Sequence, residues 1–410
     1  MKKTIVVVGA GFGGIYTCKY LLKEFKNKKI EIILINKSNY FVFTPILHEV
    51  ATGGINIHSS IEPIREVLKA KNFKFIRSEV KEINLNKRQV ILDHIIINYD
   101  QLVISVGSQT NFFDIKGAEK YTIPLKSLYD ASKIRKKIIN SLEESLNEEN
   151  EKIIKELLTF VIVGGGPTGV ELAAEIEEFI SQNLKYNYRI SKDLINIIIV
   201  QRPQKILPEL DESCIKLVRE QLEKKNIKIL YNSAVTEVNE DNIIINNKDK
   251  INTKNVIWTA GVTPNFIKTV PKITDQKNYF HVNKFLQVKN FENVFSLGDC
   301  ALFYDENKKE YAPALAQVAV KQAKIVSNNI IAILNNKQLR KYNLRLMGFL
   351  VSVGQGFGVA HIFGIHFKGR LAWFIWRTVY FFKIIGIKNK IRVGIEWALN
   401  LFFRRDINEV

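Results

Sequence analysis

Two glycine-rich segments in this chain of 410 residues have the residue types and spacing of a phosphate-binding turn: Gly9-x-Gly11-x-x-Gly14 and Gly164-x-Gly166-x-x-Gly169. In such a turn the first glycine allows a sharp bend, the second lets the backbone approach a pyrophosphate, and the third lets the following helix pack on the preceding strand. The helix N-terminus carries partial positive charge, which favours a phosphate. The repeated motif therefore predicts two sites for dinucleotides.

Each glycine turn lies inside a pattern that predicts a strand, a helix and a second strand. In the first unit we expect strands over 4–8 and 30–35 and a helix over 14–25, and in the second we expect strands over 160–163 and 195–200. The two turns are 155 residues apart, a spacing typical of two Rossmann-like domains and too long for a solenoid repeat.

The strand pattern returns after Gly261 and ends just before Asp299, so we expect the second domain to be inserted in the first. Residues 120–158 have helical spacing and are expected to cross over between the domains. The predicted architecture is α/β, with two Rossmann-like dinucleotide-binding domains and a C-terminal amphipathic segment. The expected ranges are 1–115 and 266–335 for the first domain, 116–265 for the second and 336–410 for the C-terminal region.

The residue that ends the second strand of such a unit usually contacts a ribose hydroxyl, and an acid there selects against a 2′-phosphate. This chain has Asn36-Lys37 in the first unit and Gln201-Arg202 in the second. An amide can still reach a ribose, and Arg202 could pair with a 2′-phosphate. We therefore expect NADPH to be accepted beside NADH. The alternative is that Gln201 binds the ribose of NADH alone and Arg202 is a surface residue.

The composition indicates a globular protein with a distinct tail. Hydrophobic residues make up 46% and charged residues 25%, which argues against a disordered or polytopic membrane chain. The three cysteines, Cys18, Cys214 and Cys300, are far apart and give neither a disulfide framework nor a zinc spacing, so no metal site is expected. Thirteen basic and only three acidic residues follow Asn335, in a chain of net charge +19.

Several further segments, together with the two glycine turns, resemble the type II NADH dehydrogenases, which are single-subunit NADH:quinone oxidoreductases that do not pump protons. These segments are 39–53 (NYFVFTPILHEVATG), 258–262 (WTAGV), 297–301 (LGDCA), 316–319 (AQVA) and, in the tail, 368–373 (KGRLAW). The resemblance implies FAD in the first domain, NADH in the inserted domain and a quinone that enters from the membrane. The residues expected to bind the cofactors are Gly9, Gly11, Phe12, Gly14, Asn36, Lys37, Gly107, Asp299, Gly164, Gly166, Gly169, Gln201, Arg202 and Gly261.

The resemblance also assigns residues to the reaction itself. Glu171 matches a family glutamate near the nicotinamide, where it would position the ring and influence the proton balance at the flavin. The alternative is that Glu171 only complements the macrodipole at a helix N-terminus. Gln317 matches the first of two family glutamines spaced four apart beneath the isoalloxazine, whereas Lys321 replaces the second. Lysine donates but cannot accept, and because it brings positive charge, Lys321 could stabilise a reduced, anionic quinone or flavin. The alternative is that Gln317 and Lys321 lie on a solvated helix face.

Residues 368–405 are expected to bind an anionic membrane surface. Arg377 and Lys383 interrupt the apolar run over 371–387. If this run spanned the membrane as a helix, the two charged residues would cost about 2.5–3.5 kcal/mol each. The favourable insertion of about ten apolar residues, at about 0.3–0.6 kcal/mol each, would only just offset that cost. A helix in the interface avoids that cost and leaves the basic side chains at the phosphates.

The next segment predicts an amphipathic helix with a polar stripe on one side and apolar residues on the other. The stripe is Arg392, Glu396, Asn400 and Arg404, and the apolar residues are Ile391, Ile395, Trp397, Leu399, Phe402 and Phe403. The alternatives are that this helix covers the protein's own core or makes a homodimer contact. We expect a peripheral protein on the cytoplasmic face of an inner (plasma) membrane, with the tail and Gln317 on one face.

The expected reaction has two halves, in which hydride passes from NADH to FAD and two electrons then pass to the quinone. One rival is a sulfide:quinone oxidoreductase or a disulfide reductase, but these need a cysteine pair that the spacing does not supply. A second rival is a non-enzymatic basic flavoprotein that binds membrane or nucleic acid. No nucleic acid is expected, because the tail aromatics form apolar faces rather than isolated stacking platforms.

Overall fold

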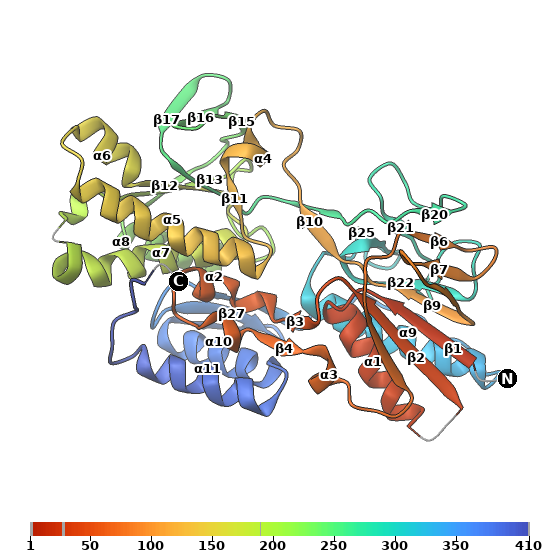
Figure 1. Cartoon of the computed structure of the whole chain (residues 1–410). Helices are drawn as coiled ribbons and strands as arrows, with labels where there is room; N and C mark the ends of the chain where they lie inside the picture. The colour runs from red at the N-terminus through yellow and green to blue at the C-terminus, as the bar shows by residue number, and fades with distance from the viewer. Residues whose placement is uncertain (1–2, 27–28, 189, 409–410) are drawn as a thin grey trace. The chain divides into compact units, whose positions relative to one another are not determined.

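The computed structural model describes residues 3–26, 29–188 and 190–408, and the chain divides into two compact units (Figure 1). The first unit comprises Met1–Phe41, Glu62–Gln109 and Val262–Met347, and the second comprises Val42–Ile61, Thr110–Gly261 and Gly348–Val410. The insertion of one unit in the other was expected. The C-terminal segment joins the second unit from Gly348 on, whereas we treated 336–410 as a region of its own. The expected assignment of a cofactor to each domain stays a prediction.

The first unit is built on a five-stranded parallel sheet with the order β22-β9-β1-β2-β5. The strands are β1 (Lys3–Val8), β2 (Ile30–Asn36), β5 (Phe73–Arg77), β9 (Gln101–Ile104) and β22 (Val294–Ser296). Helices α1 (Phe12–Glu24) and α9 (Ala316–Leu334) pack against each other beside it (Figure 1). The central strand β1 is mostly β-branched and is buried on both faces from Ile5 on, as parallel strands covered by other layers are.

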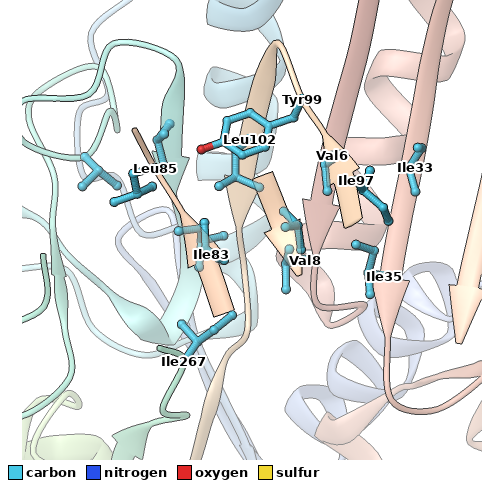
Figure 2. Close-up of a cluster of buried hydrophobic side chains, with 14 of the residues drawn as sticks. Val6, Val8, Ile33, Ile35, Ile83, Leu85, Ile97, Tyr99, Leu102 and Ile267 are labelled. Atoms are coloured by element: carbon cyan, nitrogen blue, oxygen red, sulfur yellow. The ribbon is translucent and has the colours of Figure 1, made fainter. Parts of the chain in front are cut away.

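The hydrophobic core on one side of this sheet is shared with a smaller mixed sheet (Figure 2). That sheet has the order β20-β6-β7-β8 and consists of β6 (Glu82–Asn84), β7 (Gln89–Ile91), β8 (Ile96–Asn98) and β20 (Thr269–Val270). Val6 and Val8 from β1 meet Ile83 from β6 and Ile97 from β8 in one buried cluster. This packing fixes the end of β1, from which the first glycine turn starts.

The second unit repeats the arrangement in a parallel sheet of order β11-β18-β12-β13-β14. Its strands are β11 (Ile123–Pro124), β12 (Thr159–Val163), β13 (Asn196–Val200), β14 (Ile227–Leu230) and β18 (Asn255–Trp258). The helices of this unit include α2 (Leu47–Ala51), α5 (Leu128–Leu146), α6 (Glu151–Leu157), α7 (Pro167–Asn183) and α8 (Glu212–Lys224). An antiparallel sheet of β15 (Val235–Val238), β16 (Asn242–Ile245) and β17 (Asp249–Asn252) completes this part. In both units the strand that precedes the glycine turn is central.

The C-terminal part begins with an antiparallel sheet that the sequence did not predict. It contains β26 (Gly348–Ser352), β27 (Gly358–Ile362) and β28 (Ile365–Lys368), followed by helices α10 (Gly369–Lys383) and α11 (Ile387–Leu399). Helix α10 packs on β27, so this sheet attaches the two helices to the second unit. Within the described ranges, no helix combines the length and the apolar character that crossing a membrane requires.

Candidate active site

The first glycine turn has the geometry that the sequence predicted for it. Gly9 follows β1 with a φ of +96°, and a Cβ on Gly14 would lie 1.8 Å from the carbonyl oxygen of Gly9. The helix can therefore approach the strand only if residue 14 is glycine. A Cβ on Gly11 would meet nothing within 4 Å. The second glycine thus faces open space at the N-terminus of α1, where a pyrophosphate could approach the backbone.

The second glycine turn has nearly the same geometry as the first. Gly164 has a φ of +110°, and a Cβ on Gly169 would lie 1.9 Å from the carbonyl oxygen of Gly164. Gly166 again faces open space, and it is the N-cap of α7. In α1 and in α7, no side chain caps the N-terminus and no acidic residue lies in the first turn. Both helix N-termini therefore fit the phosphates of a dinucleotide.

The amides that end the second strands brace the glycine turns. Asn36 Oδ1 accepts a hydrogen bond from the backbone N–H of Ala10 (3.0 Å). Gln201 Oε1 likewise accepts one from the backbone N–H of Gly165 (2.7 Å), while its Nε2 donates to the carbonyl of Lys205 (3.0 Å). Both units thus use a side-chain amide to brace the glycine turn. This explains why Asn36 and Gln201 occupy the positions where an acidic residue is usual. Their expected contacts with a ribose stay predictions.

The basic residues next to these amides lie on the surface. Lys37 is 77% exposed, and its Nζ lies 2.8 Å from Glu79 Oε1. Arg202 is exposed, so its guanidinium is free to reach solvent-side groups of a ligand. Gly261 directly follows β18 with a φ of +72°.

The residues expected around the flavin come together in the first unit. The hydroxyl of Ser108 donates to Asp299 Oδ2, next to Gly107, whose own Cβ position faces open space. Phe12 packs edge-on against Phe41, with ring centroids 5.0 Å apart. No pattern in the sequence singled out Gln322 on α9. Its buried Oε1 accepts a hydrogen bond from the N–H of Gly298 (2.7 Å), which fixes the turn that carries Asp299.

Gln317 and Lys321 lie one turn apart on α9, as predicted, and both contact the segment before Gly348. Gln317 Oε1 accepts a hydrogen bond from the backbone N–H of Met347 (3.0 Å). The ammonium group of Lys321 donates to the carbonyl of Arg345. Partial burial, followed by the nearby charge of Arg345, lowers the pKa of Lys321. Their expected contacts with a quinone stay predictions.

Glu171 is buried in the second unit. Its Oε1 accepts hydrogen bonds from the backbone N–H of Ser352 (3.1 Å) and from the indole of Trp376 (3.0 Å), and its Oε2 lies 3.6 Å from Nδ1 of His48. Burial raises the pKa of Glu171 to about 8 and lowers the pKa of His48 to about 4. At neutral pH a protonated carboxyl therefore faces a neutral imidazole.

This environment argues against the alternative role for Glu171. Glu171 is the fifth residue of α7, which begins at Pro167. The effect of a helix macrodipole falls off within the first turn, so complementing the dipole does not explain a buried acid at this position. A carboxyl that holds a proton near pH 8 is instead suited to acid–base work.

Glu171 belongs to a larger buried cluster that the sequence did not reveal. Arg405 is buried, and its Nη1 lies 2.6 Å from Glu175 Oε2, one helical turn beyond Glu171. Burial would raise the pKa of Glu175, but Arg405, His48 and Arg377 together outweigh it and hold that pKa below its ordinary value. Glu49 accepts a hydrogen bond from the indole of Trp397 (2.6 Å), and burial raises its pKa to about 7. Two neighbouring carboxyls therefore titrate near neutral pH.

The C-terminal helices turn several polar groups toward the protein, contrary to our prediction. Glu396, expected in a solvent-facing polar stripe, accepts hydrogen bonds from the Ser59 hydroxyl (2.7 Å) and the Asn56 N–H (3.1 Å). Trp397, expected on the opposite, membrane-facing side, is buried. Arg377, expected among the phosphates, lies over the rings of Trp373 and Trp397 at 4.2 and 4.8 Å. Periodicity alone could not show that buried acids and indoles attract these groups inward.

The opposite side of the same helices is apolar and exposed. Its residues are Leu371, Phe374, Phe382, Ile387, Ile391, Ile395, Leu399, Leu401, Phe402 and Phe403. Phe402 is 83% exposed and Ile387 79%, values that are unusual for such large apolar side chains. We call this set the apolar tail surface.

Comparison with known proteins extends the match over the chain. Residues 3–323 match the model of the pyridine nucleotide-disulphide oxidoreductase family, and residues 346–406 match that of the NDH2 C-terminal domain. A probable NADH dehydrogenase of Dictyostelium discoideum is 32% identical over 417 residues, which cover 99% of this chain and 91% of the relative. A mitochondrial internal alternative NAD(P)H-ubiquinone oxidoreductase A1 of Solanum tuberosum is 27% identical, and the match covers 100% of this chain and 88% of the relative.

A solved structure matches as well. The structure of NDH2 from Plasmodium falciparum in complex with NADH has a TM-score of 0.89, with 25% identity and 100% of both chains covered. The two glycine turns, the inserted second unit and the C-terminal match all agree: the chain belongs to the pyridine nucleotide-disulphide oxidoreductase family and, within it, to the type II NADH dehydrogenases.

Proposed function

We propose that this protein transfers hydride from NADH to FAD and passes two electrons on to a membrane quinone without pumping protons. The observation that carries the proposal is the pair of glycine turns, each of which leaves open space at an uncapped helix N-terminus in its own unit. When bound, the flavin supplies the two-electron redox chemistry. The relatives named above are NADH or NAD(P)H oxidoreductases, and the one from Solanum tuberosum is named for ubiquinone.

Residues of the first unit would hold the flavin and receive the acceptor. The N–H groups at the start of α1 would bind its pyrophosphate, with Asp299 nearby as a hydrogen-bond acceptor for hydroxyl groups. Gln317 offers both a donor and an acceptor to a quinone. Lys321 adds positive charge, which would favour an anionic reduced acceptor.

Residues of the second unit would hold NADH and manage protons. The N–H groups at the start of α7 would bind the pyrophosphate of NADH. Because Glu171 keeps its proton up to about pH 8, it could donate a proton to a reduced carrier and regain one from solvent. Arg202 would allow NADPH as a second donor.

The apolar tail surface supports a peripheral position on the membrane that holds the quinone. Burying its side chains among acyl chains removes apolar area from water, and those basic residues of the tail that are exposed add about 1 kcal/mol each near anionic lipid. The face on which the protein sits, expected to be the cytoplasmic face of an inner membrane, and a homodimer contact as the alternative use of this surface both stay proposals.

The test is NADH oxidation by the purified protein, incubated with FAD and then freed of unbound FAD, with a quinone acceptor and with and without anionic liposomes. We expect a yellow protein whose quinone reductase activity rises when liposomes carry the quinone. Ile391→Glu with Ile395→Glu should abolish flotation with liposomes while oxidation of NADH by a water-soluble quinone continues. The matched control is Ile96→Glu on β8, because Ile96 is 59% exposed and Ile395 is 54% exposed.

Two outcomes would contradict the proposal. Colourless protein that does not oxidise NADH would refute the enzymatic function. Unchanged flotation of the double variant, together with loss of a dimer in sedimentation, would assign the apolar tail surface to self-association. A sulfide-dependent reaction is not expected, because Cys18, Cys214 and Cys300 are free thiols at separate places in the fold.

A further inference from the structure

Three potential metal ligands come together in the second unit. Asp211 is the N-cap of α8, Cys214 is the third residue of that helix, and His366 lies on β28. One ligand atom of each lies within 4.8 Å of the others. Cys214 and His366 are 152 residues apart, so no spacing in the sequence could suggest the cluster.

The distances fit a tetrahedral metal. Bonds of about 2.3 Å from Zn²⁺ to sulfur and about 2.0–2.1 Å to nitrogen or oxygen place tetrahedral sulfur and nitrogen ligands about 3.5 Å apart, and nitrogen and oxygen ligands about 3.4 Å apart. Here Cys214 Sγ lies 3.6 Å from His366 Nδ1, and His366 Nδ1 lies 3.1 Å from Asp211 Oδ2. The sulfur of Cys214 and a carboxylate oxygen of Asp211 lie within 4.8 Å of each other, so a cation could bind all three once these two atoms come closer together.

Neighbouring groups orient the three ligands. Asp211 Oδ1 accepts hydrogen bonds from the Ser213 hydroxyl (2.5 Å) and the Cys214 N–H (3.0 Å). The other oxygen, Oδ2, is buried and lies next to Nδ1 of His366. The imidazole of His361 stacks on that of His366, with centroids 4.3 Å apart and planes 17° apart, which limits rotation of the ligand ring. Such outer contacts typically hold metal ligands in place.

The site is also accessible. The side chain of Cys214 forms a buried floor, whereas Asp211 is 34% and His366 47% exposed. A metal ion could enter from the side of His366, and a water molecule could occupy a fourth position. If Asp211 only capped α8 and formed an ion pair with His366, the thiol of Cys214 would not be needed beside them.

We infer that Asp211, Cys214 and His366 form a binding site for Zn²⁺. The set of thiolate, imidazole and carboxylate is one that Zn²⁺ accepts and that Mg²⁺ and Ca²⁺ do not prefer. On binding, the thiol of Cys214 releases its proton to solvent and its sulfur bonds to the metal. His366 would bind through Nδ1 and keep its proton on Nε2.

The bound metal would join α8 to the sheet that leads into the C-terminal helices. Strand β28 ends at Lys368, and α10 begins at Gly369. Helix α8 already packs on β27 and β28. A ligand that binds only the folded state stabilises it by mass action. Zn²⁺ would therefore hold the C-terminal segment more firmly on the second unit.

The test is equilibrium dialysis of ⁶⁵Zn²⁺ against the FAD-loaded full chain under reducing conditions. We expect one Zn²⁺ per chain, and an affinity at least about a hundredfold weaker in Cys214→Ser and in His366→Ala. The control is His281→Ala, because His281 Nε2 lies 3.2 Å from Asp275 Oδ2 in a pair without a thiol. This control should bind Zn²⁺ like the wild type. Because His366 is half exposed, its variant should fold even if Cys214→Ser does not.

A second measurement identifies the sulfur. Cd²⁺ added to the wild type should give a thiolate charge-transfer absorption that Cys214→Ser lacks. Cys18 and Cys300 are fully buried in the first unit and should not contribute. The inference is overturned if the wild type binds no Zn²⁺, if both ligand variants bind it as well as the wild type, or if His281→Ala removes the binding. It does not depend on the proposed redox function, since Zn²⁺ binding requires no turnover.

Discussion

Replacing Glu171 with glutamine is expected to make the protein more stable at neutral pH while slowing its turnover. The amide has nearly the shape of the carboxyl, and its oxygen can still accept the hydrogen bonds from Ser352 and Trp376. Its nitrogen can donate to the neutral imidazole of His48, 3.6 Å from the oxygen that it replaces. The variant should therefore fold in the same way.

The magnitude follows from the pKa of Glu171, which burial raises from 4.5 to about 8. Between these two values the folded state binds a proton that the unfolded state has lost. The contribution of Glu171 to stability is thus fully present below pH 4.5 and is lost as the pH rises to about 8, at up to about 1.4 kcal/mol per pH unit. At pH 7 the loss amounts to about 3 kcal/mol. A neutral amide does not titrate and avoids this loss.

The assay is thermal unfolding of the FAD-loaded protein at several pH values from 5 to 8. For a chain of this length, 3 kcal/mol corresponds to about 3 °C in Tm. The Tm of Glu171→Gln should exceed that of the wild type at pH 7 and approach it near pH 5. The control is Glu143→Gln, which makes the same chemical change on the exposed side of α5. Turnover with NADH and quinone should fall about 100- to 10,000-fold.

A variant whose Tm follows that of the wild type at every pH would refute the raised pKa of Glu171. Turnover equal to that of the wild type, with the Tm difference present, would show that the buried proton serves no step of the reaction.

Three further changes test other parts of the structure. Gly166→Val should leave the Tm nearly unchanged, because a Cβ at this position meets nothing within 4 Å. It should raise the KM for NADH at least about tenfold, because the side chain fills the space that the pyrophosphate needs. An unchanged KM would place the nucleotide elsewhere. Arg405→Met should lower the free energy of unfolding in urea by about 3–5 kcal/mol, because it leaves the buried Glu175 without the guanidinium that pairs with it. The control is Arg404→Met at the exposed neighbouring residue, which should cost less than about 0.5 kcal/mol. Equal effects of the two changes would refute the buried pair. Arg202→Ala should lower kcat/KM for NADPH about tenfold and leave that for NADH unchanged, and an equal effect on both donors would exclude a contact with a 2′-phosphate.

The sequence predicted those features that depend on local patterns. Both glycine turns, their strands and helices, and the insertion of one unit in the other could be derived from spacing and hydrophobic periodicity. The spacing of Gln317 and Lys321 placed them one helical turn apart on α9. The third glycine of each motif was predicted for the reason that the structure shows, since a Cβ there would clash with a carbonyl oxygen.

The buried cluster around Glu171 could not be predicted in this way. His48, Glu175 and Arg405 come from three distant parts of the chain, and nothing in a single sequence says that their charges meet. Glutamates at such positions on a helix are usually solvated, so burial was not the default expectation. Trp397 shows the same limit, because periodicity placed it with the apolar residues, whereas its indole N–H donates to the buried Glu49.

The buried position of Arg405 has a practical consequence for anyone who wishes to shorten this protein at its C-terminus. Deleting the apolar C-terminal helices is the obvious way to shorten the protein, but any truncation ahead of residue 405 also removes the counter-ion of two acids inside the second unit. Such a shortened protein would be expected to precipitate or to lose its fold. Substituting the exposed isoleucines of the apolar tail surface one by one is the safer way to make that surface more polar.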